Sequence, residues 1–93
     1  MFIGVLTIEL HIPGSGSLKD RRSVVKGMKD RIRSRFNVSV AEVGDTEHWQ
    51  RATLGIACVS GEKAHAGEVL DKVMDLVRSN TDADLIDYQI EIL

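Results

Sequence analysis

Basic side chains gather in one short segment of the chain. Residues 17–35, SLKDRRSVVKGMKDRIRSR, hold eight Lys or Arg and two Asp. The other residues hold four basic and twelve acidic side chains, and the formal net charge of the chain is −2. Clustered lysines and arginines bind phosphates and carboxylates through charge-assisted hydrogen bonds. Because the positive charge is local, the sequence raises the question of which anion faces it.

Helical geometry places five of these cations on one flank of a helix. At about 100° per residue, four of them lie within about 60° of one another and the fifth extends the edge. We call this set the basic stripe, and its members are Lys19, Arg22, Lys26, Lys29 and Arg33. From Arg22 to Arg33 it extends about 16 Å. Within this helix, Asp30 is the acid spaced to pair with the stripe, since it follows Lys26 by one helical turn and precedes Arg33.

RNA, or a ribosomal subunit, is the partner that this stripe favours. The contacts would be to phosphates, so binding would be largely indifferent to sequence. The alternative is a homo-oligomeric interaction or regulatory module with no nucleic-acid binding. In that case the charge is balanced within one chain or between copies by an acidic stripe on the second helix, Glu68, Asp71 and Asp75. A charge run is also commonly the solvated face of a helix.

Hydrophobic periodicity predicts the elements that position the stripe. Alternating apolar residues indicate strands at 2–12, 37–43, 51–60 and 84–93. Ser17 followed by Asp20 is typical of a helix start, so a helix begins at Leu18, and its apolar stripe continues to Phe36. A second amphipathic helix covers 62–80, and the order is βαββαβ.

One α+β architecture fits that order in a domain spanning residues 1–93. Right-handed crossovers and paired neighbouring strands favour a four-stranded antiparallel sheet with both helices on one face. This is the ferredoxin-like βαββαβ sandwich. Because that fold hosts many functions, it does not by itself assign one.

The residues that carry catalysis or bind metals are scattered in this sequence. His11, His48 and His65 fall in three different elements. Cys58 alternates with apolar residues of a strand, so we expect a buried core thiol with no base to activate it. We therefore expect no enzyme activity, no metal and no cofactor.

The polar turn after the second strand has two candidate features. Asp45, Glu47 and His48 could hold a cation weakly, although an exposed polar turn is the favoured interpretation. Trp49 is expected to pack over the end of a helix rather than to serve as a ligand platform.

The open face of the predicted sheet lacks the aromatic residues that stack bases in an RRM. It carries Thr7, Glu9, His11, Thr53, Gly55 and Ala57. Its small side chains permit close approach of another surface, so a homodimer through this face is an alternative assembly. Pairing through an edge strand, 38–43 or the C-terminal strand, is another.

The location predicted for the chain is the cytoplasm. The N-terminal run MFIGVLTI lacks a basic region and a cleavage site, so it is not read as a signal peptide. No stretch approaches the roughly 20 apolar residues of a membrane helix, and we expect no membrane partner. The lone cysteine cannot form an internal disulfide.

Three stretches resemble the YlxP-like family of small bacterial proteins, a domain of unknown function. They are SLKDRR, FNVSVAEV and WQRA, and the similarity covers nearly the whole chain. The resemblance implies a ferredoxin-like fold and a cytoplasmic bacterial protein. It also implies genes that often neighbour those of transcription, translation initiation and ribosome maturation, which favours RNA or a ribosomal particle as the polyanion. It supplies no catalytic residues.

Overall fold

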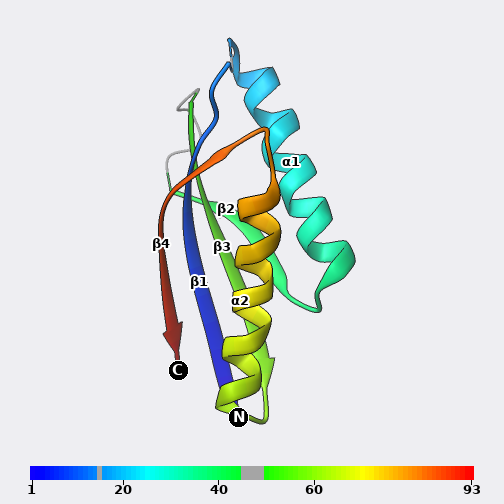
Figure 1. Cartoon of the computed structure of the whole chain (residues 1–93), viewed down its shortest axis with the longest axis vertical. Helices are drawn as coiled ribbons and strands as arrows, with labels where there is room; N and C mark the ends of the chain where they lie inside the picture. The colour runs from blue at the N-terminus through cyan, green and yellow to red at the C-terminus, as the bar shows by residue number, and fades with distance from the viewer. Residues whose placement is uncertain (15, 45–49) are drawn as a thin grey trace.

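The computed structural model describes residues 1–14, 16–44 and 50–93 and has the predicted βαββαβ order (Figure 1). Predicted and observed ends of the elements agree to within a few residues. The elements are β1 (Phe2–His11), α1 (Leu18–Arg35), β2 (Ser39–Val43), β3 (Arg51–Ser60), α2 (Lys63–Ser79) and β4 (Asp84–Ile92). Neither helix is long and apolar enough to cross a membrane in the part of the chain described.

The four strands form one antiparallel sheet in the order β2-β3-β1-β4. Both helices cover the same face of this sheet, as Figure 1 shows. Helix α1 packs against β2, whereas α2 packs against β1, β3 and β4. The ferredoxin-like sandwich predicted from the sequence is therefore confirmed, and the basic helix lies over the β2 side of the sheet.

The core lies between the sheet and the two helices. Leu6, Ile8 and Leu10 of β1 are buried on the helix side, and alternate residues such as Thr7 lie on the open face. Strand β3 repeats this period, and Cys58 at its inner face is 6% exposed, which confirms the predicted buried thiol. Strand alternation thus separates a dry inner face from an open one.

Helix α1 begins where the sequence predicts, because Ser17 caps it. The Asp20 backbone N–H donates to the Ser17 Oγ at 3.1 Å, which satisfies one of the free amides of the first turn. Val25, Met28 and Ile32 are buried on the sheet. This apolar stripe fixes the rotation of α1 and hence the direction in which its charged flank faces.

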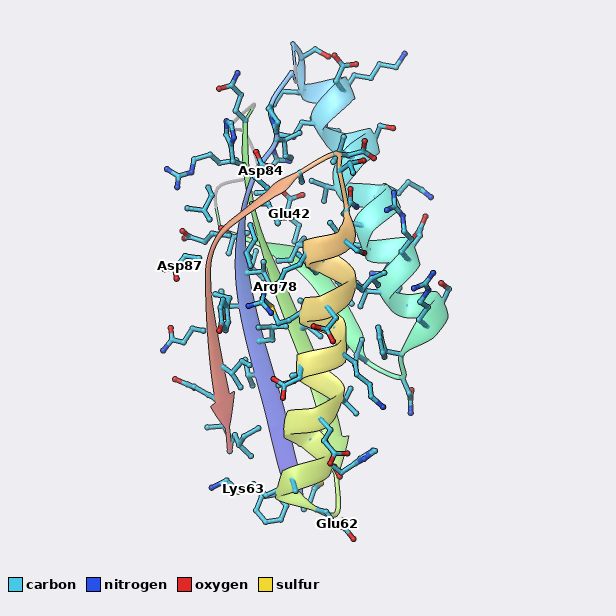
Figure 2. The ribbon with its side chains drawn as sticks, in the orientation of Figure 1. Glu42, Glu62, Lys63, Arg78, Asp84 and Asp87 are labelled. Carbon is cyan, nitrogen blue, oxygen red and sulfur yellow. The ribbon has the colours of Figure 1, made fainter. Side chains whose placement is uncertain are left out.

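Strand β4 departs from the predicted alternation at its start. The period of two in DLIDYQIEI predicts Ile86 as an inward residue. A register irregularity between Glu9 and Leu10 of β1 instead places Leu85 opposite Leu10. Ile86 is consequently exposed. Further along, Arg78 of α2 reaches toward β4, with its guanidinium 5.4 Å from the centre of the Tyr88 ring (Figure 2). This cation–π contact joins the helix to the edge strand.

Two glycines give substitution effects of opposite sign. In Gly27→Ala the new Cβ would make an ordinary van der Waals contact, 3.9 Å from the Arg31 Nη2. We expect the free energy of unfolding to rise by about 1 kcal/mol, because alanine loses less backbone entropy in a helix.

In Gly4→Ala the Cβ would lie 3.0 Å from both the Cys58 Sγ and the Leu70 Cδ1. We expect a loss of about 1–3 kcal/mol from overpacking. Urea denaturation measures both, and equal signs would contradict the packing described.

Candidate polyanion-binding site

The structure brings four of the five predicted site residues together in one depression beside α1. We call it the α1–β2 depression, and its volume is about 330 Å³. Its charged lining is Arg22, Lys26, Lys29, Arg33, Asp30 and Glu42. Lys19 is exposed one turn earlier in the helix and does not line it. Most of the basic stripe therefore forms one concave, cationic surface.

Asp30 lies within the basic stripe and pairs with two of its members. Its carboxylate accepts from the Lys26 Nζ at 2.7 Å and lies 3.9 Å from the Arg33 Nη1. The hydrogen bond from Lys26 holds the pKa of Asp30 below its ordinary value of 3.8, against the opposing effect of desolvation. The charges of Lys26, Arg33 and Lys29 act in the same direction as the hydrogen bond. These pairs are exposed, so an incoming phosphate can compete with Asp30 for the cations.

Arg33 also contacts the backbone of the sheet. Its Nη2 donates to the Val40 carbonyl oxygen of β2 at 2.7 Å. One guanidinium thus joins the C-terminal half of α1 to the edge of the sheet, and its side chain remains half exposed. This contact holds Arg33 in place more firmly than the neighbouring lysines, because a guanidinium has several donors in a fixed plane.

A buried ion pair lies behind the depression. Arg21 is 1% exposed, and its Nη2 donates to the Glu42 Oε1, while its Nε donates to the Arg51 carbonyl oxygen at 3.0 Å. The Glu42 side chain is 16% exposed, lines the depression and lies on the α1 side of the sheet (Figure 2). Arg21 therefore neutralises a carboxylate that would otherwise weaken the positive potential of the site.

The spacing of Arg21 and Glu42 in the sequence indicates this buried pair, although neither residue is among the predicted site residues. Arg21 precedes Val25, Met28 and Ile32 at the same three- and four-residue spacing, so it lies on the apolar stripe of the helix. Glu42 follows Val40 by two residues and shares its inward face of β2. A cation and an acid that both fall on core-facing positions predict a buried pair.

The acidic stripe of α2 does not balance the basic stripe within the chain. Glu68, Asp71 and Asp75 are exposed. No ion pair joins them to α1 among residues 1–14, 16–44 and 50–93. Apart from Glu42, the acid outside α1 that pairs with this helix within the described ranges is Asp82, whose Oδ2 lies 3.7 Å from the Arg31 Nη2. Balance between copies remains a prediction.

Other candidate chemistry finds no support in the described residues. No group of three or more His, Cys, Asp or Glu that could hold a metal ion occurs within the described ranges. The weak cation site predicted at Asp45, Glu47 and His48 and the anchoring role of Trp49 lie outside the described residues.

Comparison with known proteins assigns the family. The model of the family described as "Protein of unknown function (DUF503)" matches residues 3–90. The chain belongs to this family. A DUF503-type relative, the "Uncharacterized protein YlxP" of Bacillus subtilis (strain 168), is 38% identical over 77 residues, which are 83% of this chain and 84% of that protein. The YlxP-like resemblance is thereby confirmed.

Solved structures similar to this DUF503 chain agree on the fold alone. The solution NMR structure of the de novo designed protein LFR1 1 with ferredoxin fold has a TM-score of 0.58 and 10% identity, and the match covers 98% of this chain and 86% of that one. The de novo designed protein Foldit4 has a TM-score of 0.53 and 10% identity, with 98% and 96% covered. Designed proteins carry no evolved activity, and a shared fold does not by itself assign a function.

Removal of Arg21 tests the buried pair. In Arg21→Met we expect the free energy of unfolding to fall by about 3 kcal/mol, because Glu42 is left mostly buried without a partner. In the double variant Arg21→Met/Glu42→Met we expect most of that loss to be recovered. The matched control is Arg22→Met at the neighbouring exposed position, with a change below about 0.5 kcal/mol. Equal effects of the two single variants in urea denaturation would contradict a buried pair.

The titration of Asp30 tests the pairing inside the basic stripe. Because its pKa is lowered, Asp30 stabilises the fold above its ordinary pKa of 3.8, and this contribution is lost as the pH falls through the lowered value. In Lys26→Gln we expect the pKa of Asp30 to rise toward 3.8, since the largest cause of the shift is removed. Carboxyl chemical shifts followed by NMR measure this, with Lys63→Gln on α2 as control. A pKa unchanged in Lys26→Gln would place the cause elsewhere.

Proposed function

We propose that this chain is a non-enzymatic accessory protein that binds RNA or a ribosomal particle through the basic stripe. The observation that carries the proposal is the α1–β2 depression, where Arg22, Lys26, Lys29 and Arg33 converge on one surface. Asp30 and Glu42 are its acids, and Glu42 is already neutralised by Arg21. The depression thus presents an excess of positive charge to a polyanion.

The shape of the charged surface favours a polymer over a small anion. The stripe follows a helix flank for about 16 Å, which is longer than a single phosphate group requires. The depression is open to solvent along this flank, and lysine acts as a mobile point charge that accommodates phosphates in varied positions. The gene neighbourhood implied by the YlxP-like resemblance supports RNA or a ribosomal particle as that polymer.

Salt dependence gives the proposal a quantitative form. If all five stripe cations neutralise phosphates, the logarithm of the binding constant falls with the logarithm of salt concentration with a slope of about −3.5 on single strands and about −4.5 on a duplex. Contacts to phosphates position the RNA without reading its sequence. Specificity, if present, has to come from another part of the surface.

A salt titration with a charge-matched control tests this role. We expect the wild-type protein to bind structured RNA with a slope in the range above. The variant with Arg22, Lys26, Lys29 and Arg33 all changed to Gln should retain a slope of about −0.7 to −0.9, since Lys19 alone remains. The control changes four exposed cations away from the stripe to Gln and should retain the wild-type slope. These four are Arg35, Arg51, Lys63 and Lys72.

Two results would contradict RNA binding through the stripe. Equal weakening in both four-residue variants would mean that net charge, not the depression, controls binding. If the wild type binds neither RNA nor ribosomal subunits at low salt, and the stripe variant instead changes its sedimentation as an oligomer, the alternative of a homo-oligomeric module is favoured. In that case Lys26→Glu combined with Asp71→Lys should restore assembly that Lys26→Glu alone disrupts.

A further inference from the structure

Strand β3 extends beyond its neighbour β2 at both ends. The pairing runs only from Thr53 opposite Val43 to Ala57 opposite Ser39. Figure 1 shows β3 continuing past the start of β2 toward the N-terminal end of α2. At the other overhang the Arg51 carbonyl oxygen accepts a hydrogen bond from Arg21. A side-chain donor thus satisfies the outward carbonyl oxygen of Arg51 at this overhang.

The second overhang presents the backbone of Val59 to solvent. Ile3 exchanges hydrogen bonds with Leu93, at 2.9 Å from its N–H and 2.8 Å to its carbonyl oxygen. In an antiparallel sheet both groups of one residue point to the same neighbour, so Ile3 directs its groups away from β3. Val59 is the residue opposite Ile3 and therefore directs its N–H and C=O away from β1, toward the β2 side. Neither group has a hydrogen bond within the described part of the chain.

These two groups lie at the wall of a hollow that we call the β3 notch. Its volume is about 550 Å³, and it is lined by Arg33, Asn37, Val38, Ser39, Ala57 and Val59, among others. Arg33 also lines the α1–β2 depression. The side chain of Val59 is 68% exposed, so it does not close the notch. The outward N–H and C=O of Val59 therefore lie beside a notch that adjoins the α1–β2 depression. Arg33 lines both hollows.

We propose that the β3 notch binds one unpaired nucleobase of an RNA strand whose phosphates lie on the basic stripe. This inference rests on the proposed function and specifies the kind of RNA. The Watson–Crick edge of a base carries a hydrogen-bond donor and an acceptor side by side, which matches the adjacent N–H and C=O of an extended residue. Arg33 then lies between the base and the phosphates of the same strand.

The geometry favours a base over an added protein strand. Strand addition gains affinity from a row of main-chain hydrogen bonds. Of the three overhanging residues 58–60, Val59 is the one that points outward, because its neighbours direct their groups to β1. Asn37 and Val38, where the chain enters β2, also line the notch, so one side of it is formed by this chain's own residues. A planar base needs one donor and one acceptor, and the notch has the size of a small-ligand pocket.

The inference distinguishes two forms of RNA that the stripe alone would bind alike. Phosphate contacts are available on single strands and on duplexes. The bases of a duplex already use their Watson–Crick edges, and the deep, narrow major groove of an A-form duplex keeps the other donor–acceptor edges away from the Val59 groups. The protein should therefore prefer RNA with an unpaired nucleotide, with little preference among bases, since each presents a donor beside an acceptor.

The decisive experiment compares two probes and two variants at one salt concentration. The probes are a 12-nucleotide single-stranded RNA and the blunt duplex of the same sequence. In Val59→Pro the outward N–H is removed without loss of a bond to β1. We expect about a fivefold weaker affinity for the single strand and an unchanged affinity for the duplex. Val59→Thr retains the N–H and should bind both probes like the wild type.

Amide hydrogen exchange gives a second measurement that does not depend on a variant. In the free wild-type protein the Val59 amide should exchange fast while those of Gly55 and Ala57, which pair with β2, are protected. Single-stranded RNA should slow exchange at Val59, and the duplex should not. Slow exchange in the free protein would overturn the inference, as would equal exchange with both probes.

The remaining outcomes separate this inference from the proposed function. If the four-residue stripe variant loses both RNAs while Val59→Pro behaves like Val59→Thr, stripe binding holds and the notch inference is wrong. If the wild type binds neither RNA, both fail. If Val59 becomes protected as protein concentration rises without RNA, a second copy of the chain occupies the notch, and the nucleobase inference is likewise wrong.

Discussion

The buried arginine of α1 joins the three elements on which the candidate site depends. Arg21 extends from the helix to the Glu42 carboxylate of β2 and to the Arg51 carbonyl oxygen of β3. A charge removed from water persists in a fold only when its donors have partners, so this side chain fixes the helix against both strands. The rotation of α1 that it enforces, together with the apolar stripe, directs the charged flank outward above β2.

The ion pairs in this region differ between the surface and the interior. At the surface, Lys26 and Arg33 share the exposed Asp30, and such exposed pairs exchange partners at little energetic cost. Below the surface, Glu42 is held by Arg21 and is not available to the surface cations. A polyanion bound as proposed would contact cations whose existing partner, Asp30, is weakly held, while the carboxylate below them is already paired with Arg21. This arrangement is well suited to reversible, salt-sensitive binding.

Most of the fold and part of the site could be predicted from the sequence. Periods of two and of three to four residues located the strands and helices, and the basic stripe followed from helical geometry. The burial of Arg21 is not among the predictions from the sequence, because a charged side chain is ordinarily expected at the surface even when its spacing places it on the apolar stripe. Ile86 was misassigned because a register irregularity depends on pairing with β1, which local alternation does not reveal. The outward direction of the Val59 N–H and C=O could not be predicted from the sequence, because it depends on the register of β3 with its neighbours.

The free edge of the sheet on the other side is the nine-residue strand β4. A strand of that length with unpaired backbone groups is a template for fibril-like aggregation unless something discourages it. Here Asp84, Asp87 and Glu91 occur along the strand, and all three are exposed. Mutual repulsion between the acids of two such edges opposes their pairing. Protection against this kind of aggregation therefore depends on acids at the edge of the sheet opposite to the basic stripe.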